Sequence, residues 1–418
     1  MTATTPRFNP LAPGFRMDPY PLYAALREAE PVHRTLGMWV FTAHNDIRNL
    51  LRDNGFSSSL IPDEVAGRID RLPPHARADA ARIVDLGRTS LVFTDDPAHA
   101  RLRALVNRVF TRQQIEGLRP VVAQRVDDML DRLDIGVQAM TFDLIASLAS
   151  PLPCAVLVDW MALPPSLASV APEWTHEVRR LLEPGRMSVA DLTRVGRVVG
   201  DFASALRTLV DERTDQHGDD LISELARVSV GHGDRLSQTE LAYICIMCFV
   251  AGTETTTALL GNAVAALLTH PKQSAKLAAA PERAGDAIRE TLRYDSPLQM
   301  TKRVARAESR YGGQVIGCGD QVLLCLGAGN RDPEVFDAPN EFSIDRGADM
   351  RSAASHLGFG HGMHGCLGAA LAQLIAQTAL ERVWRRLELT PTGIAPTWQT
   401  ESFIIRGPSA LPVRGRSR

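Results

Sequence analysis

The 418-residue sequence is poor in lysine and cysteine, and it contains no long apolar segment that is free of charge. Its only lysines are Lys272, Lys276 and Lys302, so arginine supplies nearly all of the positive charge. The six cysteines are scattered along the chain and give no sign of a disulfide framework. No apolar stretch predicts a membrane span or a signal peptide. These absences predict a soluble protein of the cytoplasm with no membrane partner.

The charge balance excludes a second group of functions. The formal net charge is −2 and the isoelectric point is about 6.6, so nothing in the composition favours binding to nucleic acid or to an anionic membrane. Hydrophobic residues make up 45% of the chain, which is enough for a large core. Length alone suggests two or three domains. A single large cofactor that organised one core would override that expectation.

The stretch from Phe359 to Gly368 carries the clearest chemical signal. It reads Phe-Gly-His-Gly-Met-His-Gly-Cys-Leu-Gly and runs directly into an apolar-periodic segment that predicts a helix. Its glycines allow the backbone to approach a flat ligand closely, and they leave N–H groups free to point at the sulfur of Cys366. The start of the following helix favours the thiolate over the thiol. Cys366 is therefore a candidate anionic metal ligand, and the simpler alternative is a free cysteine in a glycine-rich turn.

The same ten residues also match a dinucleotide-binding fingerprint. Gly360, Gly362 and Gly365 have the G-x-G-x-x-G spacing, with Glu381 at about the expected distance downstream. That fingerprint requires a buried strand before the glycines and a second strand that carries the acid. Residues 351–356 are polar, and Glu381 falls within the same predicted helix as the residues that follow Cys366. The context therefore argues against nucleotide binding.

A long helix is predicted upstream. Ser237 and Glu240 form a capping box, and no proline follows until Pro271, so the helix is expected to span about 238–269. Its middle is unusual, because residues 251–257 place a glycine, an acid and four threonines within an otherwise apolar helix. One interpretation is a kink produced by threonine hydroxyls that bond to helix carbonyls. The other is a functional site.

Cys245 and Cys248, one turn earlier, have the C-x-x-C spacing of redox or metal sites. They lie within the apolar part of the predicted helix and have no partner pair elsewhere. Packing in the core is the better interpretation of these two residues.

The remaining pattern predicts mostly helix with a few short strands. We expect an irregular N-terminal arm over residues 1–16, a loop region with short helical pieces over 57–91, and several amphipathic helices over 113–230. The other expected elements are helices at 19–29 and 46–52, strands at 32–33, 38–42, 311–316 and 321–326, and a hairpin at 403–413.

The motif Phe-Gly-x-Gly-x-His-x-Cys-x-Gly at 359–368 resembles the haem-binding loop of the cytochromes P450. The resemblance implies one mainly α domain over residues 1–418, with a smaller β region and with haem b between the long helix and the helix after Cys366. It also implies that Cys366 is the axial thiolate of the haem iron, a ligand type that favours O–O cleavage. In that family, Phe359 would pack near the sulfur, Gly368 would lie beside the haem, and His364 would approach a propionate.

Further motifs resemble the same family in the same order along the chain. Residues 251–256 are similar to its acid–alcohol site, which implies that Ala251 and Gly252 face the haem plane, that Thr255 hydrogen-bonds the oxygen, and that Glu254 relays protons. His99 and Arg103, four residues apart, are similar to a propionate clamp, and Arg303 is similar to a third propionate ligand. Glu290 and Arg293 resemble the buried Glu-x-x-Arg pair, for which Arg346 is the candidate third member.

The resemblance implies a monooxygenase that uses O2 and takes electrons from a separate ferredoxin and ferredoxin reductase. A monomer is expected, and the tailoring of a bacterial secondary metabolite by hydroxylation, epoxidation or oxidative coupling is the favoured setting. A peroxide-driven peroxygenase and a non-catalytic haem-bearing recruitment module remain alternatives. Arg101, Arg108 and Arg112 are predicted to share one face that docks the ferredoxin, although a simple solvated face fits equally well. The predicted substrate pocket is largely apolar, with these residues: Ile244, Met247, Cys248, Leu298, Met300, Phe403 and Ile404.

Overall fold

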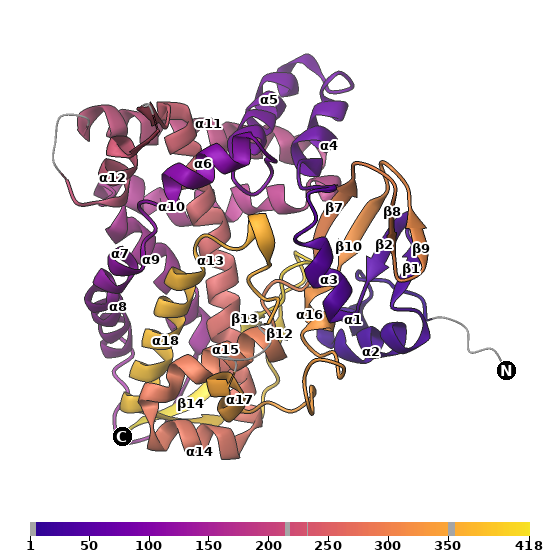
Figure 1. Cartoon of the computed structure of the whole chain (residues 1–418). Helices are drawn as coiled ribbons and strands as arrows, with labels where there is room; N and C mark the ends of the chain where they lie inside the picture. Colours follow the sequence, from indigo (N-terminus) through magenta and orange to yellow (C-terminus); the bar gives the residue numbers. More distant parts are fainter. Residues whose placement is uncertain (1–5, 214–217, 232, 350–355) are drawn as a thin grey trace. The chain divides into compact units, whose positions relative to one another are not determined.

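The computed structural model describes residues 6–213, 218–231, 233–349 and 356–418, and it is mainly helical with several small sheets (Figure 1). Contacts divide the chain into two compact units. The first unit comprises Met1–Phe56, Arg119–Pro153 and Glu254–Arg418. The second comprises Ser57–Leu118 and Cys154–Thr253.

The first unit contains all the larger sheets. The five-stranded sheet has the order β1-β2-β10-β7-β3, in which β10 runs parallel to β2 and antiparallel to β7. A three-stranded sheet has the order β11-β14-β4, and β8-β9 and β12-β13 form separate pairs. The strands are β1 (Val32–Thr35), β2 (Met38–Phe41), β3 (Phe56–Ser57), β4 (Met140–Asp143), β7 (Thr301–Ala305), β8 (Ser309–Tyr311), β9 (Gln314–Ile316), β10 (Gln321–Leu324), β11 (Leu387–Pro391), β12 (Thr397–Trp398), β13 (Pro408–Ala410) and β14 (Pro412–Ser417).

Helices cover these sheets and build most of the first unit. One face of the five-stranded sheet packs on α1 and α2 through a cluster that includes Phe8, Phe15, Tyr23, Val40 and Leu323. The helices are α1 (Pro13–Met17), α2 (Tyr20–Ala29), α3 (His44–Leu50), α8 (Arg119–Asp131), the π-helix η1 (Ile145–Ala149), α14 (Pro271–Ala279), η4 (Pro281–Arg283), α15 (Ala284–Tyr294), α16 (Leu326–Gly329), α17 (Ile344–Asp349), η5 (Gly362–His364) and α18 (Ala369–Arg386).

The second unit is helical apart from one short strand pair, β5 (Ser229–Val230) with β6 (Asp234–Arg235). Its most extensive packing joins α5 and α11, where Gly196 of α11 lies against the backbone of Asp79. The helices are α4 (Leu60–Ile69), α5 (Pro74–Thr89), α6 (Ala98–Val106), α7 (Arg112–Gly117), α10 (Pro165–Val178), η2 (Arg179–Leu182), η3 (Pro184–Arg186), α11 (Val189–Arg213) and α12 (Leu221–Arg227). Helix α9 (Pro151–Trp160) crosses the division between the units.

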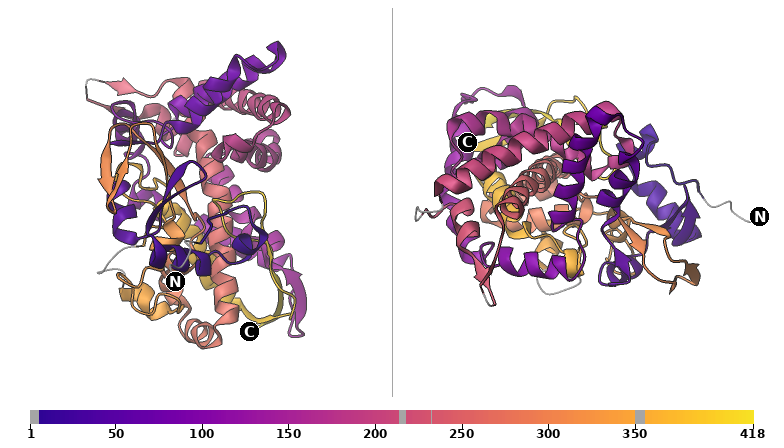
Figure 2. Two further views of the ribbon diagram at one scale, coloured as in Figure 1. Left: turned by 90° about the vertical axis from the view of Figure 1, so that its right-hand side faces the viewer. Right: turned by 90° about the horizontal axis from the view of Figure 1, so that it is seen from above.

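Helix α13 (Gln238–Thr269) is 32 residues long and passes from one unit to the other (Figures 1 and 2). The predicted capping box is confirmed, because the Glu240 N–H donates to Ser237 Oγ at 3.2 Å and the Ser237 N–H donates to Glu240 Oε2 at 2.7 Å. By length and composition α13 could cross a membrane, but 61% of its most apolar window is buried inside the structure. Burial of that kind is typical of a core helix.

Several local predictions were wrong. Residues 57–91 are mostly helix rather than loop, because Pro73 and Pro74 occupy the N-cap and the first turn of α5, where proline is tolerated. Residues 403–413 do not form a hairpin, since β13 pairs with β12 whereas β14 pairs with β11 and β4. The predicted irregular arm includes the short helix α1, and its first five residues lie outside the described part of the chain.

Candidate functional site

The loop that carries Cys366 lies in the first unit, between η5 and α18. Its backbone is closed by three hydrogen bonds: Gly360 N–H to Leu357 O at 2.8 Å, Gly365 N–H to Gly362 O at 3.0 Å, and Cys366 N–H to Phe359 O at 2.9 Å. The loop therefore has a defined shape, and Cys366 is exposed on it. Among the described residues, no three His, Cys, Asp or Glu side chains gather as a metal cluster. The described chain thus offers a single thiolate here rather than a multi-residue metal centre.

Glycine is required where this loop meets the end of α3. Gly362 has a φ of +69°, and a Cβ atom at this position would lie 2.5 Å from the carbonyl oxygen of Leu51. The contact holds the back of the loop against α3, while Phe359 and His364 remain partly exposed with Cys366. A Cβ atom on Gly368, the N-cap of α18, would have nothing within 4 Å, so protein packing alone does not require glycine there.

The first unit also contains the acid and alcohol of α13. Glu254 and Thr255 are partly exposed, whereas Thr256 is 2% exposed and Ala258 is 4% exposed. Thr257 Oγ1 donates to the carbonyl oxygen of Ala149 in η1 at 3.0 Å, so this hydroxyl bonds outside its own helix. Helix α13 remains α-helical through residues 251–257. The threonine-rich stretch therefore does not interrupt the helix.

The second unit contributes the preceding turn of α13. Ala251 is exposed although Phe249 and Val250 are fully buried. A Cβ atom on Gly252 would meet only Leu157 Cδ1, at an ordinary 3.5 Å. By contrast, a Cβ atom on Gly261 would lie within 3.0 Å of Pro408 and Ile145. Packing within the protein explains the glycine at 261 but not the one at 252, where close approach of a flat ligand would explain it.

His99 and Arg103 lie on α6 in the second unit. The side chain of His99 is buried, with Nδ1 3.9 Å from a carboxylate oxygen of Asp96. Burial and the positive charge of Arg103 lower the pKa of His99. The imidazole is therefore neutral near pH 7 and presents an N–H donor without carrying charge. Asp96 also accepts a hydrogen bond from the Ala100 N–H, in the first turn of α6, at 3.1 Å.

Arg303 lies on β7 in the first unit and is only 7% exposed. Its Nη1 donates to the Lys302 carbonyl at 2.7 Å and to Thr301 Oγ1 at 3.1 Å. A buried guanidinium requires a compensating anion or several acceptors. Arg303 is thus chemically suited to a carboxylate ligand.

The three residues of the predicted brace lie together in the first unit. Arg293 donates from Nε and Nη2 to both carboxylate oxygens of Glu290, at 2.9 and 2.8 Å, and both side chains are fully buried. Arg346 Nε lies 3.3 Å from Glu290 Oε1. The Ser343 N–H donates to the same oxygen at 3.0 Å, so the triad also holds the segment that follows Phe342.

The residues present fit a haem with a thiolate ligand. The first unit offers an exposed thiol on a rigid glycine-rich loop, a buried arginine and an acid–alcohol pair. The second unit offers a buried neutral imidazole next to an arginine, and a glycine that packing does not require. Each unit thus offers features that suit the haem-thiolate class of proteins.

Comparison with known proteins agrees with this class. The cytochrome P450 profile matches residues 285–410. The chain is 37% identical to cytochrome P450 107B1 of Saccharopolyspora erythraea over 413 residues, covering 96% of each chain. It is 32% identical to the polyketide biosynthesis cytochrome P450 PksS of Bacillus subtilis, covering 97% of this chain and 98% of that protein. The solved structure of P450BioI in complex with an acyl carrier protein ligated to hexadec-9Z-enoic acid superposes with a TM-score of 0.84 at 30% identity, covering 96% and 98% of the two chains.

The chain belongs to the cytochrome P450 family. It is a haem b monooxygenase, and its relatives include bacterial enzymes of secondary metabolism. Bound haem supplies the oxygen chemistry, while the protein binds and orients the cofactor.

The seven predicted pocket residues differ in exposure. Ile244 and Met247 are 3% and 7% exposed. Met300 is fully buried in the cluster that packs on α1 and α2, so its side chain is part of the core. Four members keep partly exposed surface, namely Cys248, Leu298, Phe403 and Ile404.

The arginines of the predicted docking face are not equivalent. Arg101 is bound by two acids, with its Nε 2.8 Å from Asp234 Oδ2 and its Nη1 2.5 Å from Glu240 Oε1. Arg108 follows the end of α6 and Arg112 begins α7, so the three residues do not share one helix. The prediction of one continuous face was wrong, because α6 ends at Val106. Arg108 and Arg112 are exposed.

Sequence reasoning missed one group of residues near the C-terminus. Asn262 in α13, Asp295 after α15 and Arg406 near the C-terminus form one hydrogen-bonded network, and Arg406 extends it to the carbonyl oxygens of Arg16 and Met17. Their partners lie more than a hundred residues away in several cases, so no local pattern reveals them.

Proposed function

We propose that the protein activates O2 with electrons from a separate ferredoxin and ferredoxin reductase and oxidises a largely apolar small molecule in bacterial secondary metabolism. The observation that carries this proposal is the partly exposed pair Glu254 and Thr255 on α13, in the same compact unit as Cys366. An acid next to an alcohol can hold and deliver the protons that oxygen cleavage consumes. A peroxide-driven enzyme has no such requirement.

In this proposal each site residue has a defined task. Cys366 is the thiolate ligand, on a loop with Phe359 and Gly368. Glu254 would receive protons from solvent and Thr255 would hold them with its hydroxyl. Ala251 and Gly252 would leave room for a haem beside α13. The residues that would bind haem propionates are His99, Arg103, Arg303 and His364.

The relatives favour a polyketide-type or acyl-chain substrate. One relative is named as an enzyme of polyketide biosynthesis, and one solved structure is of a complex with an acyl carrier protein. We propose a substrate of that class, presented either free or on a carrier protein. The partly exposed apolar residues Leu298, Phe403 and Ile404 of the first unit suit such a substrate.

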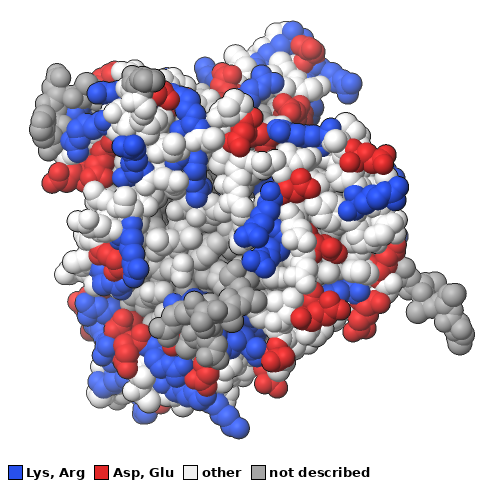
Figure 3. Space-filling view, in the orientation of Figure 1, with Lys and Arg blue, Asp and Glu red and all other residues white. Residues whose placement is uncertain are grey.

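Electrons would arrive from separate proteins in the cytoplasm. The similarity to relatives covers 96% of these 418 residues, which leaves no stretch of them for a flavin or iron–sulfur module. Basic and acidic side chains alternate over the face in Figure 3, so docking would depend on a small local patch rather than on a broad field. Arg108 and Arg112 are the better candidates for that patch, because Arg101 already pairs with two carboxylates.

The central test is the absorbance of the reduced carbon monoxide adduct. The wild-type protein is expected to give the thiolate-type Soret band, and Cys366→Ala is expected to lose it. Cys318→Ala is the matched control, since Cys318 is also exposed and lies on a different turn, between β9 and β10. A thiolate-type band that persists in Cys366→Ala would refute the assignment.

A second test separates the alternatives. Product formation with ferredoxin and reductase, and a large loss in Glu254→Gln and Thr255→Ala, supports the monooxygenase. Turnover with peroxide alone that does not depend on Glu254 and Thr255 indicates a peroxygenase. Haem binding without turnover under either condition indicates a recruitment module. A screen for spin-state shifts with free and carrier-bound acyl chains would identify the substrate class.

A further inference from the structure

The segment from Gln399 to Gly407, which we call the C-terminal loop, connects β12 to β13 and carries Phe403 and Ile404. It is braced internally. The Ser402 N–H donates to Gln399 Oε1 at 2.9 Å, and Ser402 Oγ accepts from the Ile404 and Ile405 N–H groups at 3.2 and 3.0 Å. These bonds give the loop a defined conformation, and its position depends on how the loop is anchored to the rest of the protein.

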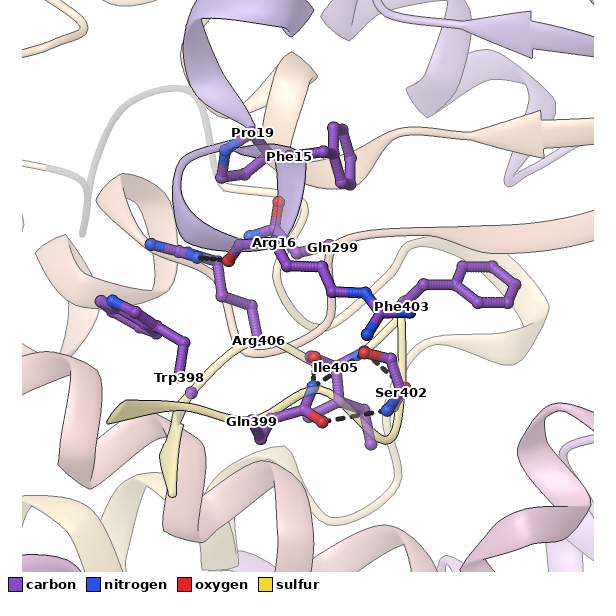
Figure 4. Close-up of a pocket in the computed structure, with 11 residues that line it drawn as sticks. Phe15, Arg16, Pro19, Gln299, Trp398, Gln399, Ser402, Phe403, Ile405 and Arg406 are labelled. Atoms are coloured by element: carbon purple, nitrogen blue, oxygen red, sulfur yellow. Dashed lines mark hydrogen bonds between the residues drawn. The ribbon is translucent and has the colours of Figure 1, made fainter. Parts of the chain in front are cut away.

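Arg406 makes the main side-chain anchor (Figure 4). Its Nε donates to Asp295 Oδ1 at 2.8 Å, and its two other nitrogens donate to the carbonyl oxygens of Arg16 at 2.8 Å and Met17 at 3.1 Å. The guanidinium also lies 3.8 Å from the centre of the Trp398 ring. One side chain thus ties the C-terminal loop to the end of α1 and to the residue that follows α15.

Two further contacts reinforce this tie. Arg16 Nη1 donates back to the Thr400 carbonyl at 2.8 Å. Tyr20 Oη donates to the same Asp295 oxygen that Arg406 uses, at 2.7 Å. Asp295 is 8% exposed, so these donors supply the hydrogen bonds that its carboxylate would otherwise make with water.

Packing behind the loop is incomplete. A small cavity of about 20 Å³ is lined by Phe15, Arg16, Gln299 and Trp398, among others. Gln299 Oε1 is buried there and has no hydrogen-bond partner. The N–H of Gln299 donates to the Ile404 carbonyl at 2.7 Å. The position of the loop therefore depends on these polar contacts together with the packing of Phe403 and Ile404 against the buried cluster around Phe15.

The base of the loop is docked on the face of α13 that carries Thr255. Thr255, Ala258 and Asn262 are spaced by three and four residues and share one face of the helix. A Cβ atom on Gly407 would lie 2.6 Å from Ala258 Cβ, so the backbone approaches α13 as closely as glycine allows. Asn262 Nδ2 donates to the carbonyl oxygens of Asp295 at 2.9 Å and Arg406 at 3.1 Å. These contacts fix the position of the loop relative to α13, the helix that carries Glu254 and Thr255.

We infer that Arg406 is a positioning residue that selects substrates, because its contacts with Asp295 and α1 set where the C-terminal loop holds Phe403 and Ile404. In Figure 4, the ring of Phe403 extends away from the guanidinium of Arg406, although both residues line the same small pocket. Phe403 and Ile404 also pack against the buried cluster that contains Phe15, so a shift of the loop would move both apolar side chains. The inference rests on the proposed function, in which Phe403 and Ile404 contact the substrate.

The test compares two probes that bind haem iron through the same nitrogen. Imidazole is small, whereas 1-dodecylimidazole adds a long apolar tail that occupies the substrate pocket. Absorbance titrations of the haem-loaded enzyme give the Kd of each probe, and their ratio isolates the part of binding that involves the pocket. The variants are Arg406→Met and Asp295→Asn. Arg27→Met is the matched control, because Arg27 is similarly buried, at 14% against 10%, and also lies beside an aspartate, Asp332.

In Arg406→Met the Kd ratio is expected to change by roughly tenfold, which is the effect of adding or removing one apolar group in a pocket, with the imidazole Kd unchanged. Asp295→Asn is expected to shift the ratio in the same direction, and Arg27→Met to leave it unchanged. Backbone amides of residues 397–410 should exchange hydrogen faster in Arg406→Met and Asp295→Asn than in Arg27→Met.

An unchanged ratio and unchanged exchange in Arg406→Met would overturn the inference. If Arg406→Met fails to bind haem, the Kd ratio and the hydrogen exchange of Asp295→Asn test the inference instead. If the wild-type protein did not show the thiolate-type spectrum, the proposed function would be refuted. That outcome is distinct from an unchanged Kd ratio, which refutes only the role of Arg406.

Discussion

Arg293 and Glu290 form a two-fold hydrogen-bonded ion pair in which neither side chain is accessible to solvent. The guanidinium of Arg293 also donates to the carbonyl oxygens of Asn330, Pro339 and Glu341, at 3.1, 2.8 and 3.0 Å. One buried pair therefore connects α15 to residues 330–341, which follow α16 and precede α17.

Removal of Arg293 should strongly destabilise the protein. Arg293→Met leaves the Glu290 carboxylate buried without its main partner, and such changes cost about 3–5 kcal/mol. The free energy of unfolding in urea measures the effect. Arg385→Met is the control, since Arg385 pairs with Glu381 at a half-exposed site where an ion pair contributes less than about 1 kcal/mol. Equal losses for the two variants would contradict the importance assigned to burial.

The contact between α5 and α11 should depend on Gly196. A Cβ atom at this position would lie 2.2 Å from the carbonyl oxygen of Asp79, so Gly196→Ala must push the helices apart. We expect a loss of about 1–3 kcal/mol in the free energy of unfolding. Gly67→Ala, in α4, has nothing within 4 Å and should be neutral or stabilising by up to about 1 kcal/mol. An unchanged free energy of unfolding in Gly196→Ala would show that α5 and α11 can separate without destabilising the protein.

Gly252 and Gly261 should respond oppositely to alanine in the haem-free protein. A Cβ atom at 252 meets only Leu157 at 3.5 Å, so Gly252→Ala should keep or raise the unfolding temperature. Gly261→Ala should lower it, because its Cβ atom would lie 2.8 Å from Pro408. If Gly252 serves haem approach, Gly252→Ala should lose haem faster to an apoprotein acceptor than the wild type does. Unaltered haem loss would contradict that role.

Burial of His33 should make stability depend on pH. The side chain is 3% exposed, and burial lowers its pKa from the ordinary value of 6.5. The unfolded state therefore binds the proton more readily, so the contribution of this site is complete above about pH 6.5 and is lost as the pH falls toward the folded-state pKa. Urea unfolding at pH 7.5 and pH 5.5 should show a larger loss in wild type than in His33→Leu. Equal losses would show that His33 has the same pKa in the folded and unfolded states.

Local sequence determined the features that depend on near neighbours. The capping box and the absence of proline predicted the bounds of α13, because helix ends are decided by residues within one turn. The spacing of Glu290 and Arg293 placed both on one face of a helix for the same reason. The glycines around Cys366 predicted its loop, since the conformational freedom of a glycine is a property of that residue alone.

Tertiary structure decided what depends on distant partners. Arg101 carried the same sequence signal as Arg108, yet only the fold brings Asp234 and Glu240 to it. The sequence of residues 403–413 predicted a hairpin, but β14 pairs with β11 and β4 instead. The anchor at Arg406 joins residues nearly four hundred positions apart, from Arg16 to Arg406. Such contacts follow from how elements pack in space, and side-chain packing of that range leaves no periodic trace in the sequence.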